Sequence, residues 1–356
     1  MTGPTLPVRM APNTFEHFYR GGARIAELRG LTLDSDHRPE EWLAATVARF
    51  GEDEVGLART QDGDLLRDLV AKDPRTWVGD DPARLGRASD SDTGVLVKLL
   101  DAAQRLPVHV HPDREFARRH LGCDYGKTEA WYVLAADEDA AVYLGWSDDV
   151  RPEELAERRD AQDSDWMLAR MNRVPVRRGD GILVPAGLAH ALGEGVFVVE
   201  AQEPTDFSIV LEWSVTTSSR EDSHLGLGFD TAMRAVTHHA LALAGLENLR
   251  AHVPATAESS GPMRCLPEAA DPFFRIDVLA PPEGETCPVP GGYAVALVLD
   301  GTGSLVSERG EVDVRRGEVL AVPAAFGDWQ LRGRARVVLS RPGQGWPVGL
   351  TGEVRP

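Results

Sequence analysis

One stretch of this chain occurs twice, and the repeat limits the folds that the chain can adopt. Residues 174–190, VPVRRGDGILVPAGLAH, align without gaps to residues 312–328, VDVRRGEVLAVPAAFGD. Both copies share Val-x-Val-Arg-Arg-Gly and Val-Pro-Ala, which predicts a turn, an apolar strand and a bend in each. A repeated strand–turn–strand unit predicts two β-domains of similar build, and 356 residues are enough for both.

The two copies differ at the residue that ends them. The first copy contains the pattern G-x5-P-x-G-x2-H, in which Pro185 and Gly187 predict a tight bend that returns His190 beside the preceding strands. In the second copy Asp328 stands where His190 stands in the first, and residues 290–311 contain no His-x-His pair. We therefore expect the second domain to be a metal-free structural barrel.

Two further motifs complete a predicted metal site in the first domain. In LPVHVHPD (106–113), His109 and His111 are two residues apart in an alternating apolar segment, so on a strand both imidazoles face the same side. In GKTEAWYVL (126–134), Glu129 precedes a β-rich stretch and can direct its carboxylate toward the same ion. Together with His190, this set of three imidazoles and one carboxylate suits one divalent metal, most simply Zn²⁺, with open coordination positions.

A His-x-His pair alone is as often chance as ligand, so the prediction rests on the combination of motifs. The remaining histidines occur in polar or helical stretches without a matching partner, and we expect them to be solvated surface residues. They are His17, His37, His120, His224, His238, His239 and His252.

These motifs resemble those of the cupin superfamily, and in particular the type I phosphomannose isomerases, zinc-dependent enzymes that interconvert mannose 6-phosphate and fructose 6-phosphate. The resemblance runs from about residue 18 to residue 213 and is strongest in residues 96–113, 126–134 and 184–206. It implies a mainly β fold with flanking helices and two cupin-type (jelly-roll) β-barrels. It also implies that His109, His111, Glu129 and His190 hold the metal, and that the active site contains Lys98, Lys127 and Glu200.

The implied reaction is an aldose–ketose isomerisation through an enediol intermediate, in which a metal stabilises negative charge and a base moves a proton. Glu200 and Lys127 are both candidates for the base, and Gln202 and Asp206 are weaker candidates that would act behind the ligands. A redox cofactor is disfavoured, because no G-x-G-x-x-G follows a strand and no phosphate loop is recognisable.

The sequence departs from the family pattern at two places. Pro107 and His109 replace a serine and a glutamine, and Val210 stands where the family has an arginine at the reacting end of the sugar. The substitutes for this arginine would be His109, Lys127, or an arginine brought from the helical segment 148–173, such as Arg170 or Arg173. Two alternatives therefore stay open: an isomerase of a free or differently substituted sugar, and a non-catalytic sugar-binding cupin.

Bulk properties restrict the partners. A net charge of −18 disfavours nucleic acid and anionic membranes, so we expect a small sugar or sugar phosphate as the ligand. The three widely spaced cysteines are typical of reduced thiols in the cytoplasm, and no stretch reaches the ~18 apolar residues of a spanning helix. The N-terminal residues also lack the apolar region of a signal peptide. The sequence leaves the oligomeric state open.

We expect a metal-binding domain at residues 1–255, with helical segments at 148–173 and 230–253, and a degenerate second cupin-like barrel at 256–356. The boundary lies in the polar, proline-containing stretch 251–262. A short helix is predicted over 63–79, and residues 95–100 and 108–111 are predicted to form paired strands. In 230–253 the apolar residues Met233, Val236, Leu241 and Leu243 are predicted core contacts, whereas Trp42 fits either a helix or a strand.

Overall fold

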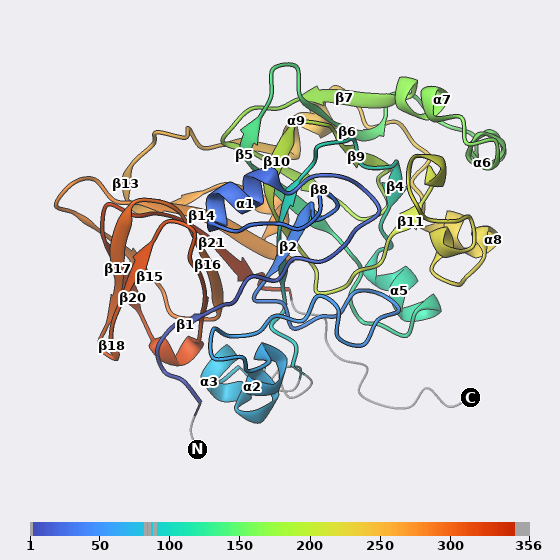
Figure 1. The fold of residues 1–356 in the computed structure, drawn as a ribbon. Coiled ribbons are helices and arrows are strands. Elements are labelled where there is room, and N and C mark those ends of the chain that lie inside the picture. Colours follow the sequence, from blue (N-terminus) through green and yellow to red (C-terminus); the bar gives the residue numbers. More distant parts are fainter. Residues whose placement is uncertain (1–2, 82–83, 85–86, 88–90, 346–356) are drawn as a thin grey trace.

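The computed structural model describes residues 3–81, 84, 87 and 91–345, and these form a mainly β molecule with helices along its edges (Figure 1). The expected fold class is confirmed. Each half of the molecule contains one larger and one smaller antiparallel sheet, and the sheets are paired layers that do not close into complete barrels. The terminal residues of both expected domains, 1–2 and 346–356, lie outside the described residues.

The first half contains a six-stranded and a five-stranded sheet. The six-stranded sheet has the order β12 (Arg250–His252), β8 (Asp180–Val184), β5 (Glu129–Ala136), β10 (Val196–Gln202), β3 (Leu96–Asp101), β2 (Glu40–Leu43). The five-stranded sheet has the order β11 (Ile209–Val210), β4 (His109–Val110), β9 (His190–Leu192), β6 (Ala141–Trp146), β7 (Met171–Pro175).

The second half repeats this arrangement. Its six-stranded sheet has the order β1 (Val8–Arg9), β19 (Val319–Val322), β16 (Ala294–Asp300), β21 (Arg336–Pro342), β14 (Phe274–Ala280), β13 (Ser259–Arg264). Its four-stranded sheet has the order β15 (Thr286–Val289), β20 (Trp329–Gly333), β17 (Thr302–Ser307), β18 (Gly310–Arg315). The repeated sequence explains the match, because Val184 and Val322 hold the same position in the two copies and pair with the neighbouring strand in both halves.

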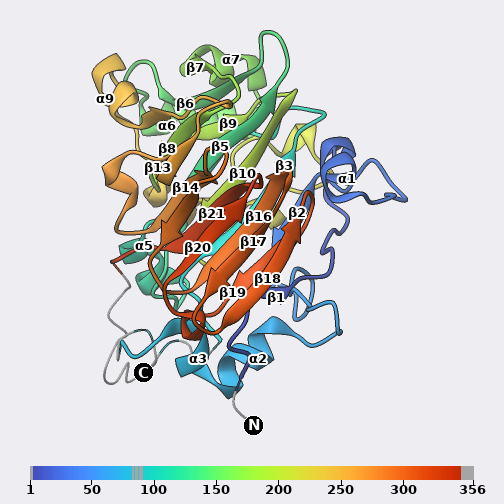
Figure 2. The same cartoon turned by 90° about the vertical axis from the view of Figure 1, so that its left-hand side faces the viewer.

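Strand β1 is an exception to the division of the chain. Although it begins near the N-terminus, Val8 and Arg9 pair with Ala321 and Leu320 of the second half. The two large sheets pack face to face, since one core cluster contains inward residues of both, among them Leu99 and Val278 (Figure 2). Side chains alternate along β5, so that Trp131 and Val133 instead pack inside the first half.

The helices flank these sheets. They are α1 (Ala23–Arg29), α2 (Leu66–Lys72), α3 (Pro74–Val78), α5 (Arg114–His120), α6 (Pro152–Asp160), α7 (Ser164–Ala169), α8 (Phe229–Ala232) and α9 (Leu243–Asn248). Short 3-10 turns cover Trp213–Val215, Asp222–His224, Met233–Ala235, Glu268–Ala270 and Ala324–Phe326. None of the helices in the described part of the chain is long and apolar enough to cross a membrane.

The structure differs from several local expectations. Strands β3 and β4 do not pair with each other, because β3 joins the large sheet and β4 the small one. The helix expected over 63–79 is split into α2 and α3 at Asp73, whose side chain accepts a hydrogen bond from the backbone N–H of Thr76, with Pro74 as the first residue of α3. Trp42 lies on strand β2.

The second expected helical segment, 230–253, contains only short helices and ends in strand β12. Val236 is buried there as expected, but Leu243 is 76% exposed because it begins α9 on the surface. The apolar spacing alone was therefore a poor guide to burial in this segment.

Candidate active site

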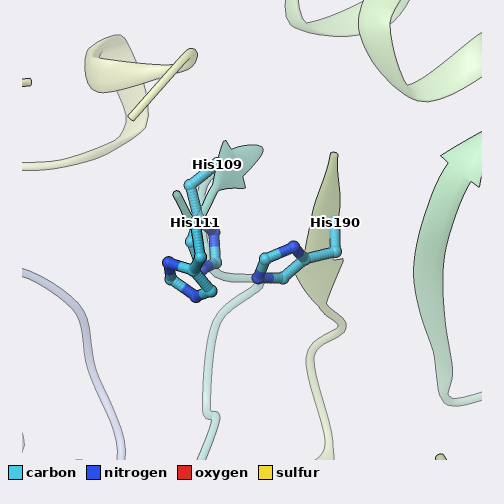
Figure 3. Close-up of side chains that lie close together, drawn as sticks. All are labelled: His109, His111 and His190. Atoms are coloured by element: carbon cyan, nitrogen blue, oxygen red, sulfur yellow. The ribbon is translucent and has the colours of Figure 1, made fainter. Parts of the chain in front are cut away.

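Three histidines meet where β4 and β9 run side by side. His109 of β4 pairs with His190 of β9, and His111 follows directly after β4. One ring nitrogen from each lies within 4.8 Å of the others, and Figure 3 shows the three rings turned toward a common centre. Buried Glu212 fixes the start of this segment by accepting hydrogen bonds from the backbone N–H of Val108 and from Arg105.

Backbone carbonyl groups determine which nitrogen of each histidine ring carries the hydrogen. The Nδ1 atoms of His109, His111 and His190 each lie 2.8 Å from a backbone carbonyl oxygen, those of Pro107, Phe207 and Leu188 respectively. A carbonyl oxygen can only accept, so each Nδ1 carries the hydrogen and each neutral ring presents an unprotonated Nε2. Burial lowers the pKa of His109 well below its usual value and that of His111 to about 3, which keeps both rings neutral.

Glu129, the first residue of β5, completes the group. One of its carboxylate oxygens lies 2.9 Å from Nε2 of His111 and the other 3.4 Å from Nε2 of His190. Burial alone would raise the pKa of Glu129, but Lys127 and His111 hold it well below its usual value. The four side chains predicted as ligands are thus brought together.

The chemistry of this group fits a metal ion. An ionised carboxylate facing unprotonated imidazole nitrogens is repulsive unless a cation lies between them. Among the described residues, Nε2 of His190 and Oε2 of Glu129 are buried without a hydrogen-bond partner, a state that native structures rarely leave uncompensated. The ammonium of Lys127 donates to Nε2 of His111 at 2.9 Å and lies 3.2 Å from Glu129, so positive charge is already favoured here.

A cavity of about 630 Å³ opens beside these residues. His109, Glu129 and Lys127 line it, whereas His111 and His190 lie behind its wall. It also contains the remaining residues predicted for the active site, Lys98 and Glu200. The cavity therefore joins the expected ligand set to the expected catalytic residues.

Lys98 lies at the centre of a group of carboxylates. Its Nζ is 3.6 Å from Glu40, 3.8 Å from Glu200 and 3.6 Å from Asp206, and 4.4 Å from the centre of the Trp42 ring. Sheet pairing produces this cluster, because β3 lies between β2 and β10 and places Lys98 opposite both Trp42 and Glu200. Burial disfavours the charged ammonium, but the three acids outweigh it and raise the pKa of Lys98.

Glu200 has the opposite environment. Burial, reinforced by the negative charge of Glu129, raises the pKa of Glu200 to about 7. The indole N–H of Trp131 donates to Oε2 of Glu200 at 3.1 Å and orients the carboxyl group. A carboxyl group with this pKa can exchange protons near neutral pH.

The sequence reasoning missed a second group in the cavity. Glu40 accepts hydrogen bonds from the hydroxyl of Tyr19 and the indole of Trp42, both at 2.8 Å, and lies 3.5 Å from Nε2 of His17. Although burial opposes its ionisation, His17 and Lys98 lower the pKa of Glu40 to about 2. His17 was expected on the solvated surface, but its side chain is only 8% exposed and lines the cavity, because residues 13–17 pack along β2.

Gln202 and Asp206, the weaker candidates, occupy different places. Asp206 lines the cavity beside Lys98. Gln202 is buried in the wall and donates to the backbone carbonyl of Thr205.

Of the residues proposed as substitutes for the family arginine, His109 and Lys127 line the cavity. Within the described chain, Arg170 and Arg173 do not: Arg170 stacks on Trp166 and Arg173 donates to a backbone carbonyl far from the ligands. Helices α6 and α7 therefore supply no residue to the lining of the cavity. The arginine that does line it is Arg49, in the loop after β2.

No family model matches the chain. Two curated bacterial proteins align with it over nearly their full lengths. The probable mannose-6-phosphate isomerase of Bacillus subtilis is 25% identical over 338 residues, which cover 95% of this chain and 100% of the relative. The mannose-6-phosphate isomerase of Streptococcus mutans is 28% identical over 322 residues, which cover 90% and 93%. The chain is therefore similar to these mannose-6-phosphate isomerases over nearly its whole length.

The crystal structure of the mannose 6-phosphate isomerase from Bacillus subtilis has the same fold. It matches with a TM-score of 0.72 and 21% identity, covering 94% of this chain and 99% of that one.

The two departures from the phosphomannose isomerase pattern are neighbours in space. His109 and Val210 are direct partners in the pairing of β4 with β11, and both line the cavity. The replacement of glutamine by histidine and of arginine by valine therefore changes one spot beside the ligand set.

Proposed function

We propose that this protein is a metal-dependent aldose–ketose isomerase that interconverts mannose 6-phosphate and fructose 6-phosphate through an enediol intermediate. Relatives carrying this activity in their names align with the chain over almost its entire length. The observation that carries the proposal is the single cavity that joins Glu200 and Lys98 to the histidine group. A sugar-binding protein without turnover would not need a buried carboxyl group with a pKa of about 7 in that place.

We assign the metal to His109, His111, Glu129 and His190, and expect zinc, which commonly binds imidazole and carboxylate ligands. When bound, the ion supplies positive charge that neutralises negative charge developing on the oxygens of the substrate. The backbone carbonyls that accept from the Nδ1 atoms hold the three rings in orientation and leave each Nε2 available to the ion.

In this proposal Glu200 transfers the proton that moves between C1 and C2 of the sugar. Its ionised form takes the proton from C2 of the aldose and the resulting carboxylic acid returns it to C1, while the proton of the C2 hydroxyl passes to the oxygen on C1. Trp131 holds the carboxyl group in position, and the Lys98 ammonium lies 3.8 Å away, where it stabilises the ionised form. Lys127 is the alternative base, but its Nζ is engaged by His111 at 2.9 Å and by Glu129 at 3.2 Å.

One observation favours the alternative of an unphosphorylated sugar. The cavity is lined by six acidic residues (Glu16, Glu40, Glu129, Glu200, Asp206, Asp222) and only three basic ones (Arg49, Lys98, Lys127) among the described residues. Lys98 and Lys127 already face carboxylates, and Val210 brings no charge. Arg49 at the cavity wall pairs only with the exposed Glu52 among the described carboxylates, and is then the cation best placed for a phosphate.

Proton NMR in deuterated water separates these possibilities. The purified, metal-loaded protein is incubated with mannose 6-phosphate or with free mannose, and deuterium incorporation at C1 and C2 is followed. We expect exchange with mannose 6-phosphate, and none with the Glu200→Gln variant. Exchange with free mannose alone would support the alternative substrate, and no exchange with either sugar would support a binding protein.

We also propose that the chain divides near residue 255 into the metal-binding domain and the second barrel, with β1 contributed to the latter.

A cytoplasmic location is proposed because Cys123, Cys265 and Cys287 are free thiols, as expected in a reducing compartment.

A further inference from the structure

The second half of the molecule contains an unusual group of charges on the inner face of its large sheet. Arg275 of β14 and Arg341 of β21 are direct cross-strand partners, and Asp277 lies two residues further along β14. Asp277 is completely buried, whereas the side chains of Arg275 and Arg341 are 35% and 15% exposed. Like charges placed opposite each other on neighbouring strands destabilise a sheet unless they are compensated.

The compensation within the chain is incomplete. One oxygen of Asp277 accepts a hydrogen bond from Arg341 at 2.7 Å, while the other lies 3.5 Å from Arg275 and makes no hydrogen bond. The Nε–H groups of both arginines are buried and also lack an acceptor among the described residues. Two guanidinium groups thus share one carboxylate, in a protein whose net charge is −18.

Both arginines line a cavity of about 520 Å³ that is separate from the candidate active site. Its wall includes Trp329 and Val289, which are buried and apolar, and Asp328. This cavity occupies the place in the second half that the candidate active-site cavity occupies in the first. Asp328 aligns with His190, and β14 and β21 hold the places of β3 and β10 in their sheet. In the second half Asp328 stands in place of His190, and the two guanidinium groups lie on the strands equivalent to those that carry Lys98 and Glu200 in the first half.

We propose that this cavity is a binding site for the phosphate group of a small metabolite. A guanidinium group presents parallel N–H donors that match the oxygens of a phosphate, and two such groups converge here. A bound phosphate would accept hydrogen bonds from the accessible N–H groups of the two guanidinium groups and would relieve the repulsion between Arg275 and Arg341. Trp329 and Val289 offer an apolar wall for the organic part of the ligand.

Isothermal titration calorimetry with inorganic phosphate tests the site in the full chain. Arg275→Gln is the variant of choice, because Arg341 pairs closely with buried Asp277 and its loss would leave that charge unpaired. The matched control is Arg334→Gln, which removes the same charge from an exposed arginine of the same half, paired with Glu283 outside the cavity. We expect phosphate affinity to fall about tenfold or more in Arg275→Gln and to stay unchanged in the control.

A variant that is expected to bind phosphate more tightly completes the test, because a folding defect cannot increase the affinity. Asp328→Asn removes a negative charge from the cavity but keeps an oxygen that can accept the hydrogen bond now made by the N–H of Gly291. Affinity for phosphate should rise several-fold in this variant. A parallel titration with glycerol 3-phosphate identifies the source: tighter binding than inorganic phosphate indicates a phosphorylated metabolite, and equal binding indicates the free ion.

Phosphate binding that is the same in wild type, Arg275→Gln and Asp328→Asn would overturn the proposal, as would no saturable binding at all. Isomerase activity is not part of this readout, so failure here and failure of the proposed function are distinguishable.

Discussion

Glu200 differs from the other buried acids of the cavity because its pKa is raised, to about 7, whereas that of Glu40 is lowered to about 2. If Glu200 is the base, it must be ionised in the free enzyme, so kcat/KM should fall as the pH drops through its pKa. A bound metal adds positive charge and shifts this limb to pH 7 or below. Glu200→Gln should reduce kcat by about 10²–10⁴-fold, the usual contribution of general base catalysis.

The pH–rate profile of mannose 6-phosphate isomerisation measures this limb. A Glu200→Gln enzyme that retains wild-type turnover and the same acidic limb would exclude Glu200 as the base. Glu40→Gln is an informative companion, because a group with a pKa of about 2 cannot produce a limb near neutral pH.

A substitution at Glu129 should lower the affinity for the metal much more than it lowers the stability of the fold. Glu129→Gln removes the charge that offsets the metal but leaves the core around Val133, Val184 and Leu183 intact. We expect metal affinity to decrease by at least about tenfold, with a much smaller change in the thermal midpoint of the metal-free protein. Inductively coupled plasma analysis after dialysis and differential scanning calorimetry measure the two effects.

The calorimetry needs metal-free wild type as its reference. If removing the metal from the wild type lowers the thermal midpoint by many degrees, and Glu129→Gln does no more, the ion stabilises the fold and its role at this site is structural.

Local spacing was enough to predict that four side chains converge, but not the rest of the cavity. His109, His111, Glu129 and His190 stand in short motifs whose strand geometry brings them together. Glu40 and His17 have no such motif. They reach Lys98 only through the pairing of β2 with β3, which connects segments far apart in sequence, and Trp42 fitted a helix as well as a strand.

At the level of elements, the pairing of β4 with β11 makes His109 and Val210 a coupled site. Val210→Arg alone should bring its side chain against the His109 imidazole and therefore weaken metal binding. The double variant His109→Gln/Val210→Arg restores both family residues, and we expect it to have higher mannose 6-phosphate turnover than either single variant. The gain should approach the ~10²–10³-fold that one such donor typically contributes.

Steady-state kinetics with mannose 6-phosphate and mannose for the four proteins checks this prediction. Strict additivity of the two single changes would show that the two positions act independently. If no activity responds to any change, position 210 does not face the substrate and its correspondence to the family arginine is wrong.

The bend between β8 and β9 should be sensitive to a single methyl group. Gly187 has a φ of +90°, and a Cβ there would lie 2.9 Å from Oγ1 of Thr237. Gly187→Ala should cost about 1–3 kcal/mol, and it should also displace His190 and lower metal affinity. Chemical denaturation and a metal titration measure the two effects, and Gly63→Ala, at a similar φ with open space around it, is the control for backbone strain alone. Equal losses of metal affinity in the two variants would contradict the expected displacement of His190.

The pairing of the strands was harder to predict than their positions in the sequence. The apolar alternation located β3 and β4, but nothing local indicates that the chain crosses between them from the large to the small sheet. Likewise β1, only two residues long, carries no periodic signal, although it pairs with the second half. The ends of the helices depend instead on capping residues such as Asp73, which divides a segment whose apolar spacing predicts one helix.

At the scale of the whole molecule, the repeat predicted two similar halves, and the matching sheet orders follow from it. The halves differ in the chemistry of their openings: three histidines and a carboxylate in the first, two arginines and an aspartate in the second. Guanidinium groups do not ligate metals, since they remain protonated. The same scaffold thus presents side chains that suit a cation in one half and side chains that suit an anion in the other.

This difference predicts a metal content near one divalent ion per chain, held in the first half. The purified protein, loaded with zinc and freed of excess, should contain about one equivalent by plasma emission analysis, because its described residues offer one convergent histidine group. His111→Ala/His190→Ala removes two buried ligands and should abolish tight binding, whereas Arg275→Gln in the second half should leave the content unchanged. The double variant must be compared with metal-free wild type by circular dichroism, so that lost binding is not mistaken for lost fold. About two equivalents per chain, or full retention of metal by the double variant, would place the metal somewhere other than the group formed by β4, β5 and β9.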